Sequence, residues 1–171
     1  YNLGDTGQAV TNFNRAIGYV PGLGVLYANL GDAHAKAYEY DLAIVDYTKA
    51  IRLDPADVMS HLKRGDAYLI KEKYELAISD FTEAIRLDPE CAMAYNHRGM
   101  AYHLTGRNDL ALKDLNKVIF EMEPLYEGGN AAVIYLDTLK NRSIVYDKMG
   151  LHEEAERDMK RYRELTANTS K

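Results

Sequence analysis

The six residues Ala-Ile-Arg-Leu-Asp-Pro at positions 50–55 recur unchanged at positions 84–89, which is 34 residues later. The same interval separates Pro21, Pro55 and Pro89, and it also separates columns of small and of large apolar residues. These columns are Ala9, Ala43, Ala77 and Ala111; Ala16, Ala50 and Ala84; Gly31, Gly65 and Gly99; and Phe13, Tyr47, Phe81 and Leu115. A fixed period across this many columns indicates an array of repeated supersecondary units.

A single unit, 58–91, shows how each repeat is expected to fold. Its apolar and small residues fall three and four positions apart, which predicts one amphipathic helix over about 58–71 and a second over about 74–87. Pro89 lacks an amide hydrogen and disfavours helix in the residue before it, so the second helix should end just before it. The short link between the helices predicts an antiparallel hairpin, with Gly65, Ala77 and Ala84 where the helices approach closely.

The columns resemble the tetratricopeptide repeat (TPR), whose positions are a large aromatic residue, Leu-Gly, Tyr, Gly, Tyr, Ala, Phe, Ala and Pro. The unit 24–57 carries Tyr27, Leu30, Gly31, Tyr40, Ala43, Tyr47, Ala50 and Pro55. The unit 58–91 carries Gly65, Tyr68, Tyr74, Ala77, Phe81, Ala84 and Pro89, but His61 replaces the aromatic residue and Arg64 the leucine. The unit 92–125 carries Tyr95, Gly99, Tyr102, Gly106, Ala111 and Leu115, and departs at Arg98, Asn108 and Val118. The resemblance implies an all-α, right-handed α-solenoid of antiparallel helical hairpins, with a concave groove lined by the first helix of each pair.

The two ends of the chain depart from the regular period. We expect one domain over 1–171, made of a partial repeat 1–23, repeats 24–57, 58–91 and 92–125, an inserted linker 126–135, a repeat 136–165 and a tail 166–171. In the partial repeat Tyr1 should sit late in a first helix, so the apolar face of the next helix, about 6–19, needs cover from upstream residues or another surface. Gly150 and Ala155 align with Gly106 and Ala111 at 44 residues, which predicts an insertion near 127–130 and a long helix over about 131–149. The last helix, about 152–165, has the polar outer face of a terminal capping helix.

Composition excludes several classes of function. The net charge of −5 opposes binding to phosphate backbones, so we expect no nucleic-acid partner. A helical-repeat RNA reader would need a basic groove, and the positions expected to face inward carry more acids than bases. Cys91 is the sole cysteine, which rules out an internal disulfide. No apolar run approaches the roughly 18 residues of a membrane span, so we expect no membrane insertion and a cytoplasmic location.

No motif in the sequence indicates catalysis. Most of the fourteen tyrosines fall in the packing columns of the repeat, where aromatic residues are ordinarily interior. The five histidines lack the short fixed spacing of metal ligands, and Gly128-Gly129 is followed by no Lys-Ser or Lys-Thr of a phosphate loop. We therefore expect a chain that is not an enzyme and that holds no metal or cofactor.

The candidate binding site is the groove that the first helices would line. Its predicted members, on three successive first helices, are Asp32, Met59, Leu62, Asp66, Met93, Asn96 and Met100. The methionines and the leucine predict a soft apolar strip, and methionine is common on peptide-binding surfaces. Asp32 and Asp66 favour a ligand with Lys or Arg beside its apolar anchors. Chaperone-binding members of the family hold an acidic carboxyl-terminal tail with Lys, Asn and Arg, and the aligned Ala28, Asp32, Lys63, Met93 and His97 disfavour that clamp.

Two functions follow from these features. The first is a protein-interaction scaffold that binds a partner peptide or helix in the concave groove, with a basic and apolar ligand. The second is a structural self-association module that forms homo-oligomers through the unfinished N-terminal hairpin. A monomer at all concentrations in ultracentrifugation would exclude the second.

Overall fold

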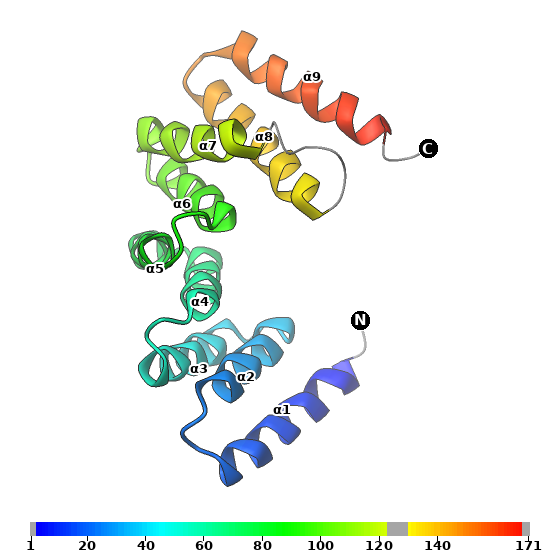
Figure 1. The fold of residues 1–171 in the computed structure, drawn as a ribbon. Coiled ribbons are helices and arrows are strands. Elements are labelled where there is room, and N and C mark those ends of the chain that lie inside the picture. Colours follow the sequence, from blue (N-terminus) through cyan, green and yellow to red (C-terminus); the bar gives the residue numbers. More distant parts are fainter. Residues whose placement is uncertain (1–2, 123–129, 169–171) are drawn as a thin grey trace. The chain divides into compact units, whose positions relative to one another are not determined.

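The computed structural model describes residues 3–122 and 130–168, and in these residues all regular secondary structure is α-helical (Figure 1). The helices are α1 (Leu3–Tyr19), α2 (Gly24–Lys36), α3 (Tyr40–Leu53), α4 (Val58–Ile70), α5 (Tyr74–Leu87), α6 (Ala92–Leu104), α7 (Asn108–Met122), α8 (Asn130–Lys148) and α9 (His152–Asn168). Contacts divide the chain into two compact units, Tyr1–Pro89 and Glu90–Lys171. The first carries α1–α5 and the second α6–α9, and we call them unit 1 and unit 2.

Unit 1 contains two helical hairpins and one preceding helix. The pairs α2/α3 and α4/α5 form the hairpins, α3 packs against α4, and α1 packs against α2. Each hairpin closes where a glycine on its first helix faces a large ring on its second. A Cβ atom on Gly65 would lie 2.6 Å from Cε1 of Phe81, and Gly31 meets Tyr47 in the same way. Ala43 and Ala77 are fully buried beside these contacts, so the columns read from the sequence do form the hairpin core.

Unit 2 is built from the hairpins α6/α7 and α8/α9. Gly99 faces Leu115, as Gly65 faces Phe81 in unit 1. The helix α8 packs against α7 and also against α6. Two clusters of buried residues hold these helices together: Ala111, Leu115 and Val145, and Ile119, Tyr135, Leu139 and Leu165.

The fold class predicted from the sequence, an all-α helical-repeat solenoid, is confirmed. Helices α4 and α5 match their predicted ranges within one residue. Two helix boundaries differ: α1 begins at Leu3, before the predicted start at residue 6, and α9 continues to Asn168, within the predicted tail. The long helix predicted over about 131–149 is α8, Asn130–Lys148, so residues 130–135 of the stretch assigned to the linker are helical. The predicted insertion falls mainly in 123–129, which lies outside the described residues.

The single domain over 1–171 stays a prediction, and the contacts within the chain cluster into two units. Repeats of a solenoid contact only their neighbours, so few long-range contacts tie distant repeats together. None of the helices in the described part of the chain combines the length and the apolar character that crossing a bilayer requires.

Candidate functional site

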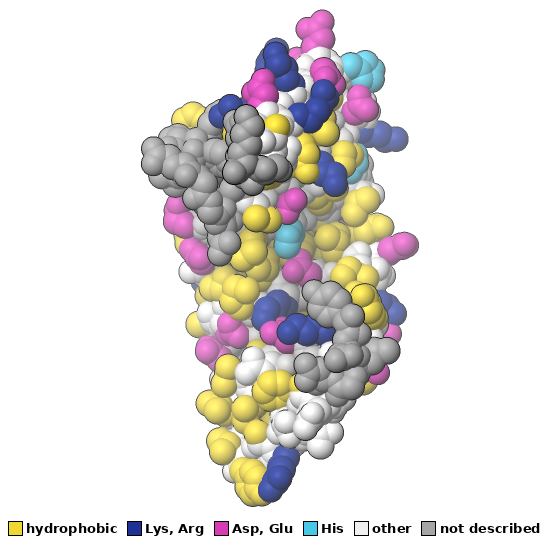
Figure 2. Space-filling view, turned by 90° about the vertical axis from the view of Figure 1, so that its right-hand side faces the viewer, with side chains coloured by type: hydrophobic (Ala, Val, Ile, Leu, Met, Phe, Trp, Pro, Cys, Tyr) yellow, Lys and Arg dark blue, Asp and Glu magenta, His cyan; other side chains and the backbone are white. Residues whose placement is uncertain are grey.

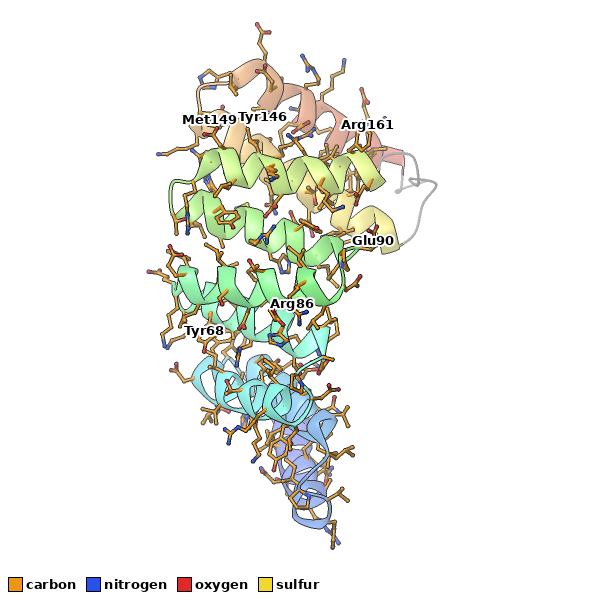
Figure 3. The ribbon with its side chains drawn as sticks, turned by 60° about the vertical axis from the view of Figure 1, so that its left-hand side comes forward. Tyr68, Arg86, Glu90, Tyr146, Met149 and Arg161 are labelled. Carbon is orange, nitrogen blue, oxygen red and sulfur yellow. The ribbon has the colours of Figure 1, made fainter. Side chains whose placement is uncertain are left out.

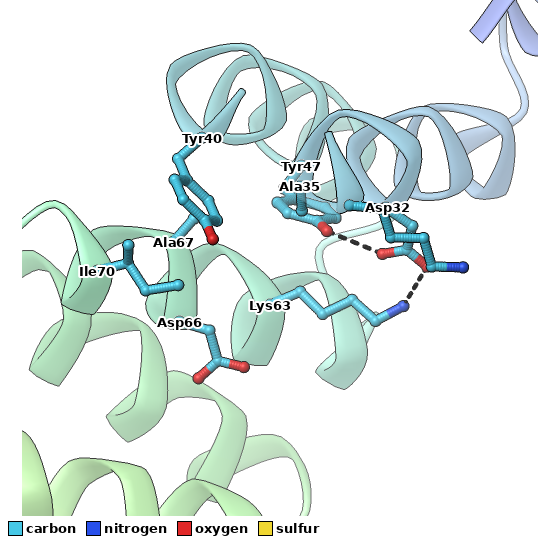
Figure 4. A pocket seen from close by; sticks show the side chains of 9 residues that line it. Asp32, Ala35, Tyr40, Tyr47, Lys63, Asp66, Ala67 and Ile70 are labelled. Carbon is cyan, nitrogen blue, oxygen red and sulfur yellow. Dashed lines mark hydrogen bonds and ion pairs between the residues drawn. The ribbon is translucent and has the colours of Figure 1, made fainter. Parts of the chain in front are cut away.

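A pocket of about 370 Å³ opens on unit 1 between α2 and α4, the first helices of its two hairpins (Figure 4). Two tyrosines of α3 complete the lining. The residues around it are Asp32, Ala35 and Lys36 of α2, Tyr40 and Tyr47 of α3, and Lys63, Asp66, Ala67 and Ile70 of α4. Ala35 of α2 and Ala67 of α4 contribute small side chains to this lining. Its volume lies in the range of small ligand sites.

One end of the pocket is a fixed polar network. Oδ1 of Asp32 accepts a hydrogen bond from the Tyr47 hydroxyl (2.8 Å), and Oδ2 of Asp32 forms an ion pair with Lys63 Nζ (2.6 Å). The buried position of Tyr47, together with the neighbouring Asp32 carboxylate, raises the pKa of its hydroxyl, which therefore stays a donor at neutral pH. Both oxygens of Asp32 are thus engaged, and Lys63 is held against it.

The other end of the pocket mixes apolar walls with one carboxylate. Figure 4 shows the Tyr40 hydroxyl pointing toward α4, the helix that carries Asp66, Ala67 and Ile70. Ile70 is exposed, with 55% of its surface accessible. In the lower part of Figure 2, hydrophobic side chains cover much of the visible surface, and charged side chains of both signs lie side by side among them. Because Ile70 and Asp66 both belong to its lining, the pocket can contact both an apolar and a charged group of a ligand.

Of the residues predicted for the groove on unit 1, the structure brings Asp32 and Asp66 into this pocket and leaves Met59 exposed on α4. The prediction for Leu62 is wrong, because Leu62 is only 2% exposed and belongs to the core. Leu62 lies three positions before Gly65 and therefore shares the helix face that packs against Phe81. The prediction also treated the two aspartates as equivalent, whereas Asp32 is neutralised by Lys63.

Unit 2 holds the other three predicted residues, all on α6. Met93 is exposed and Met100 is half-buried. The prediction for Asn96 is wrong: Asn96 is 2% exposed, and its Oδ1 accepts a hydrogen bond from Asn141 Nδ2 of α8 at 3.1 Å. The helix α8 packs directly on this part of α6 and covers it. A continuous strip that joins Met59 to Met93 and Met100 stays a prediction, since these residues belong to different units.

An ion pair that repeats along the chain was missed from the sequence. Arg64 donates to both carboxylate oxygens of Asp80 (2.7 and 2.8 Å), with the partners sixteen residues apart. The same bidentate pairs join Arg98 to Asp114 and Arg142 to Asp158. Arg64 and Arg98 are the two departures from the family's leucine, and they lie one period apart, as do Asp80 and Asp114. That periodicity was the signal that could have revealed the pairs.

These arginines also link neighbouring hairpins and stack near tyrosines. Arg64 donates to Thr48 of α3 at 3.0 Å, and Arg142 donates to Asn116 of α7 at 2.8 Å. Tyr68 and Tyr146, labelled in Figure 3, lie with their rings 6.0 and 5.6 Å from the guanidinium carbons of Arg64 and Arg142. The arginine–aspartate pairs are largely buried. They therefore stabilise the packing of neighbouring helices and offer no surface to a ligand.

The hairpin α2/α3 replaces this arginine by Leu30 and binds its aspartate differently. His34 Nδ1 lies 2.6 Å from Asp46 Oδ2. Burial raises the pKa of Asp46, and the hydrogen bond from His34 only partly opposes that effect. Within residues 3–122 and 130–168 no group of three or more His, Cys, Asp or Glu side chains is arranged to hold a metal ion.

Comparison with family models assigns the repeat. A tetratricopeptide repeat model matches residues 62–124, and a second TPR repeat model matches residues 39–70. Together they span 39–124, which includes the pocket residues of α3 and α4. No curated protein sequence matches the chain.

Solved structures share the fold at low sequence identity. BtubC (BKLC) from P. vanneervenii superposes with a TM-score of 0.88 at 18% identity, covering 98% of this chain and 75% of that one. MamA superposes with a TM-score of 0.83 at 22% identity, covering 98% and 92%. The first TPR of Spaghetti (RPAP3), bound to HSP90 peptide SRMEEVD, superposes with a TM-score of 0.64 at 24% identity, covering 74% and 93%. At these identities the likeness establishes the fold alone.

Proposed function

Because this chain belongs to the tetratricopeptide repeat family, whose repeats are in general non-catalytic protein-interaction modules, we propose that it is a scaffold that binds a segment of a partner protein between α2 and α4 of unit 1. The observation that carries the proposal is the pocket of about 370 Å³ between these helices. An extended peptide or one face of a helix could lie along the two helices and place a side chain in the pocket.

The chemistry of the pocket favours a peptide different from the one held by the Spaghetti domain. That protein is bound to the peptide SRMEEVD, which supports a peptide as the class of ligand. Asp32 lines the pocket here and already pairs with Lys63, so a glutamate or a terminal carboxylate of a ligand would have to compete with that carboxylate for the lysine. We therefore propose a peptide segment that is not acidic at this position.

The proposal is tested by one substitution at the rim of the pocket and a matched control. Ile70→Glu places a charge on the exposed apolar wall, whereas Val45→Glu makes a comparable change on α3 at a side chain that is 63% exposed and does not line the pocket. Peptides selected from a random phage library against the full chain are labelled and measured by fluorescence anisotropy. Ile70→Glu should weaken their binding about tenfold, which is the effect of losing one well-packed contact, and Val45→Glu should leave it unchanged.

Two results would overturn the proposal: equal effects of the two substitutions, or no binding peptide at all. Circular dichroism and the urea midpoint establish that both variants remain folded. Leu62→Glu is unsuitable for this test because it would place a charge in the core.

The exposed apolar residues at the end of α1 favour self-association as a second candidate function. Tyr19 is 73% and Val20 is 51% exposed, and Phe13 on the same helix is only half-buried. A second copy that packs against α1 would cover them. Sedimentation velocity across a concentration series checks this candidate: a dimer that is lost on Phe13→Glu supports it, and a monomer at every concentration contradicts it.

A further inference from the structure

We infer that a second pocket, between α8 and α9 in unit 2, binds an amphipathic helix of a partner protein that brings lysine or arginine side chains to Asp147 and Glu156. This inference goes beyond the proposed function, because it concerns another surface and another kind of ligand. The pocket has a volume of about 400 Å³, and we call it the α8/α9 pocket. Its lining comes from Ser143, Ile144 and Asp147 of α8 and from His152, Ala155, Glu156 and Met159 of α9.

The preceding hairpin, α6/α7, shows what packs on this face of a hairpin. The interval of 44 residues that aligns Ala155 with Ala111 also aligns Met159 with Leu115. Ala111 and Leu115 pack against Val145, and α8 contacts both helices of the α6/α7 hairpin. The fold thus places a helix on this face of α6/α7, whereas the corresponding Ala155 and Met159 line the α8/α9 pocket. A helix is therefore the form of ligand that suits the pocket.

Two carboxylates distinguish the α8/α9 pocket from the covered face of α6/α7. In the same register, Glu156 replaces Leu112, which packs on the cluster around Val145, and Asp147 replaces His103. Among the described residues that line the pocket, two are acidic, one is a histidine and none is a lysine or an arginine. A helix with a purely apolar face would cover the carboxylates with apolar surface, which is costly. A helix that carries cations beside its apolar face would instead form charge-assisted hydrogen bonds with them.

The present partners of the two carboxylates are compatible with such a ligand. Asp147 Oδ1 lies 2.7 Å from His152 Nδ1, and Glu156 accepts a hydrogen bond from Arg163 at 2.8 Å. All four side chains are more than half exposed, and ion pairs at that exposure contribute little to stability. A carboxylate also accepts several hydrogen bonds, so a ligand cation can join these partners or replace them. An imidazole can donate a hydrogen bond without carrying charge, so the contact with His152 does not by itself cancel the charge of Asp147.

The apolar part of the pocket gives the helix its anchor. Ile144 is 41% exposed, Met159 is half-buried and Ala155 is buried, so the pocket has an apolar floor and an accessible apolar wall. Methionine adapts its shape to different apolar side chains. Lysine and arginine pack their stems on apolar surface while their charged heads stay polar. The arrangement fits a helix with one apolar row and a cationic row beside it.

The test uses three short designed helical peptides that share one row of leucines. In the row beside it they carry lysine, glutamine or glutamate. Each labelled peptide is titrated with the full chain and followed by fluorescence anisotropy, and backbone amide shifts in NMR spectra locate the site on α8 and α9. We expect the lysine peptide to bind about fivefold more tightly than the glutamine peptide, the order of effect of partly exposed charge pairs. The glutamate peptide should bind most weakly.

Matched variants assign the charge and the apolar contact to residues. The double variant Asp147→Asn/Glu156→Gln should remove the preference for lysine over glutamine. Asp137→Asn, at an exposed carboxylate of α8 that does not line the pocket, should leave the preference intact. Ile144→Glu should weaken binding of the glutamine peptide about tenfold, the effect of losing one well-packed contact. Its control is Leu110→Glu on α7, at a side chain that is 43% exposed and outside the pocket, which should change nothing.

Several outcomes would overturn the inference. One is a glutamine or glutamate peptide that binds as tightly as the lysine peptide, and another is equal effects of Ile144→Glu and Leu110→Glu. Amide shifts that avoid α8 and α9 would also contradict it. Sedimentation velocity that shows a dimer lost on Ile144→Glu would assign the pocket to a second copy of the chain in place of a partner protein. Circular dichroism establishes that the variants remain folded.

The inference and the proposed function can fail separately. Ile70→Glu, which changes the pocket of unit 1, should leave binding of the lysine peptide unchanged. If Ile70→Glu weakens that binding and Ile144→Glu does not, the peptide lies in unit 1, so the scaffold proposal is supported and the inference about unit 2 is overturned.

Discussion

Units 1 and 2 repeat one hairpin, but they make its turn with different residues. All four turns place their middle residue in the left-handed region: Tyr38 (φ 63°) and Glu72 (φ 57°) in unit 1, Gly106 (φ 78°) and Gly150 (φ 77°) in unit 2. The turns also share a backbone hydrogen bond, from Lys73 N to Tyr68 O (2.9 Å) in one unit and from Arg107 N to Tyr102 O (2.8 Å) in the other. Packing of the hairpin thus imposes the conformation, and unit 1 holds side chains in it at a cost of about 1 kcal/mol each.

The two units also differ where their first helices meet. In unit 1 the helices α2 and α4 leave a pocket between them. In unit 2 the longer α8 packs against α6, and the Asn96–Asn141 hydrogen bond closes that face. The same repeat therefore leaves a pocket between the first helices of unit 1, whereas in unit 2 the Asn96–Asn141 hydrogen bond joins the two first helices. This is why the candidate site is assigned to unit 1.

The largest expected effect comes from breaking a buried ion pair in unit 2. Asp114→Ala leaves Arg98, which is 15% exposed, without its bidentate partner, and should destabilise the chain by about 3 kcal/mol. Asp46→Ala in unit 1 removes a single hydrogen bond of a histidine, in place of a bidentate pair with an arginine that stays charged. Its cost should be nearer 1 kcal/mol. Urea denaturation measures the free energy of unfolding of each variant. Equal decreases for the two variants would show that the arginine–aspartate pair stabilises the chain no more than the histidine–aspartate pair does.

Overpacking the hairpin core should have the next largest effect. Ala77 and Ala111 are fully buried at equivalent positions of units 1 and 2. Ala77→Leu and Ala111→Leu insert methylene groups where two helices touch, and each should cost about 2 kcal/mol. Hydrogen exchange followed by mass spectrometry resolves the two units: each variant should lose protection mainly in its own unit. Equal loss of protection in both units would show that they unfold together.

The sequence predicted the hairpins because their determinants are local and periodic. The spacing of Gly65, Ala77 and Phe81 specifies both helices and their contact, and Gly65 meets Phe81 in the structure. Helix ends were predicted less well at α1 and α9, where the repeat has no regular neighbour. The long helix predicted over about 131–149 lies at Asn130–Lys148 in the structure, although the insertion interrupts the repeat register.

The candidate site could be predicted only in part, because a first helix of this fold is covered on more than one side. The helix α4 buries Ser60, His61 and Leu62 in succession, which a helix with a single apolar stripe would not do. Periodicity alone could not tell that Leu62 faces its own hairpin. The neutralisation of Asp32 by Lys63 depends on side chains 31 residues apart, and only the structure brings them together.

Exchanging the turn residues tests the first difference between the units. Glu72→Gly should stabilise the chain by about 0.5–1 kcal/mol, because glycine relieves the left-handed strain but gains freedom in the unfolded chain. Gly106→Ala should destabilise it by about 1 kcal/mol for the opposite reason. A rise in the urea midpoint for the first variant and a fall for the second would support the comparison. If Glu72→Gly lowers the midpoint, Glu72 makes a contact in unit 1 that outweighs the strain.

The smallest expected effect is a pH dependence that has opposite signs at two aspartates of α3. Burial raises the pKa of Asp46 above the model-compound value of 3.8, so the folded state binds its proton more tightly than the unfolded state does. The contribution of Asp46 to stability is therefore greatest at low pH, and it falls as the pH rises from 3.8 through the folded-state pKa. Lys71 lowers the pKa of Asp41 by hydrogen bonding, so the contribution of Asp41 is present above 3.8 and is lost as the pH falls.

Each aspartate can be tested as a difference from the parent chain, which cancels the other carboxyl groups. Urea midpoints of the parent, Asp46→Asn and Asp41→Asn are compared near pH 4 and at pH 7. On going from pH 7 to pH 4, the parent should gain stability relative to Asp46→Asn and lose stability relative to Asp41→Asn. The same sign for both variants would contradict the assignment, since it would mean that the His34 hydrogen bond outweighs the burial of Asp46.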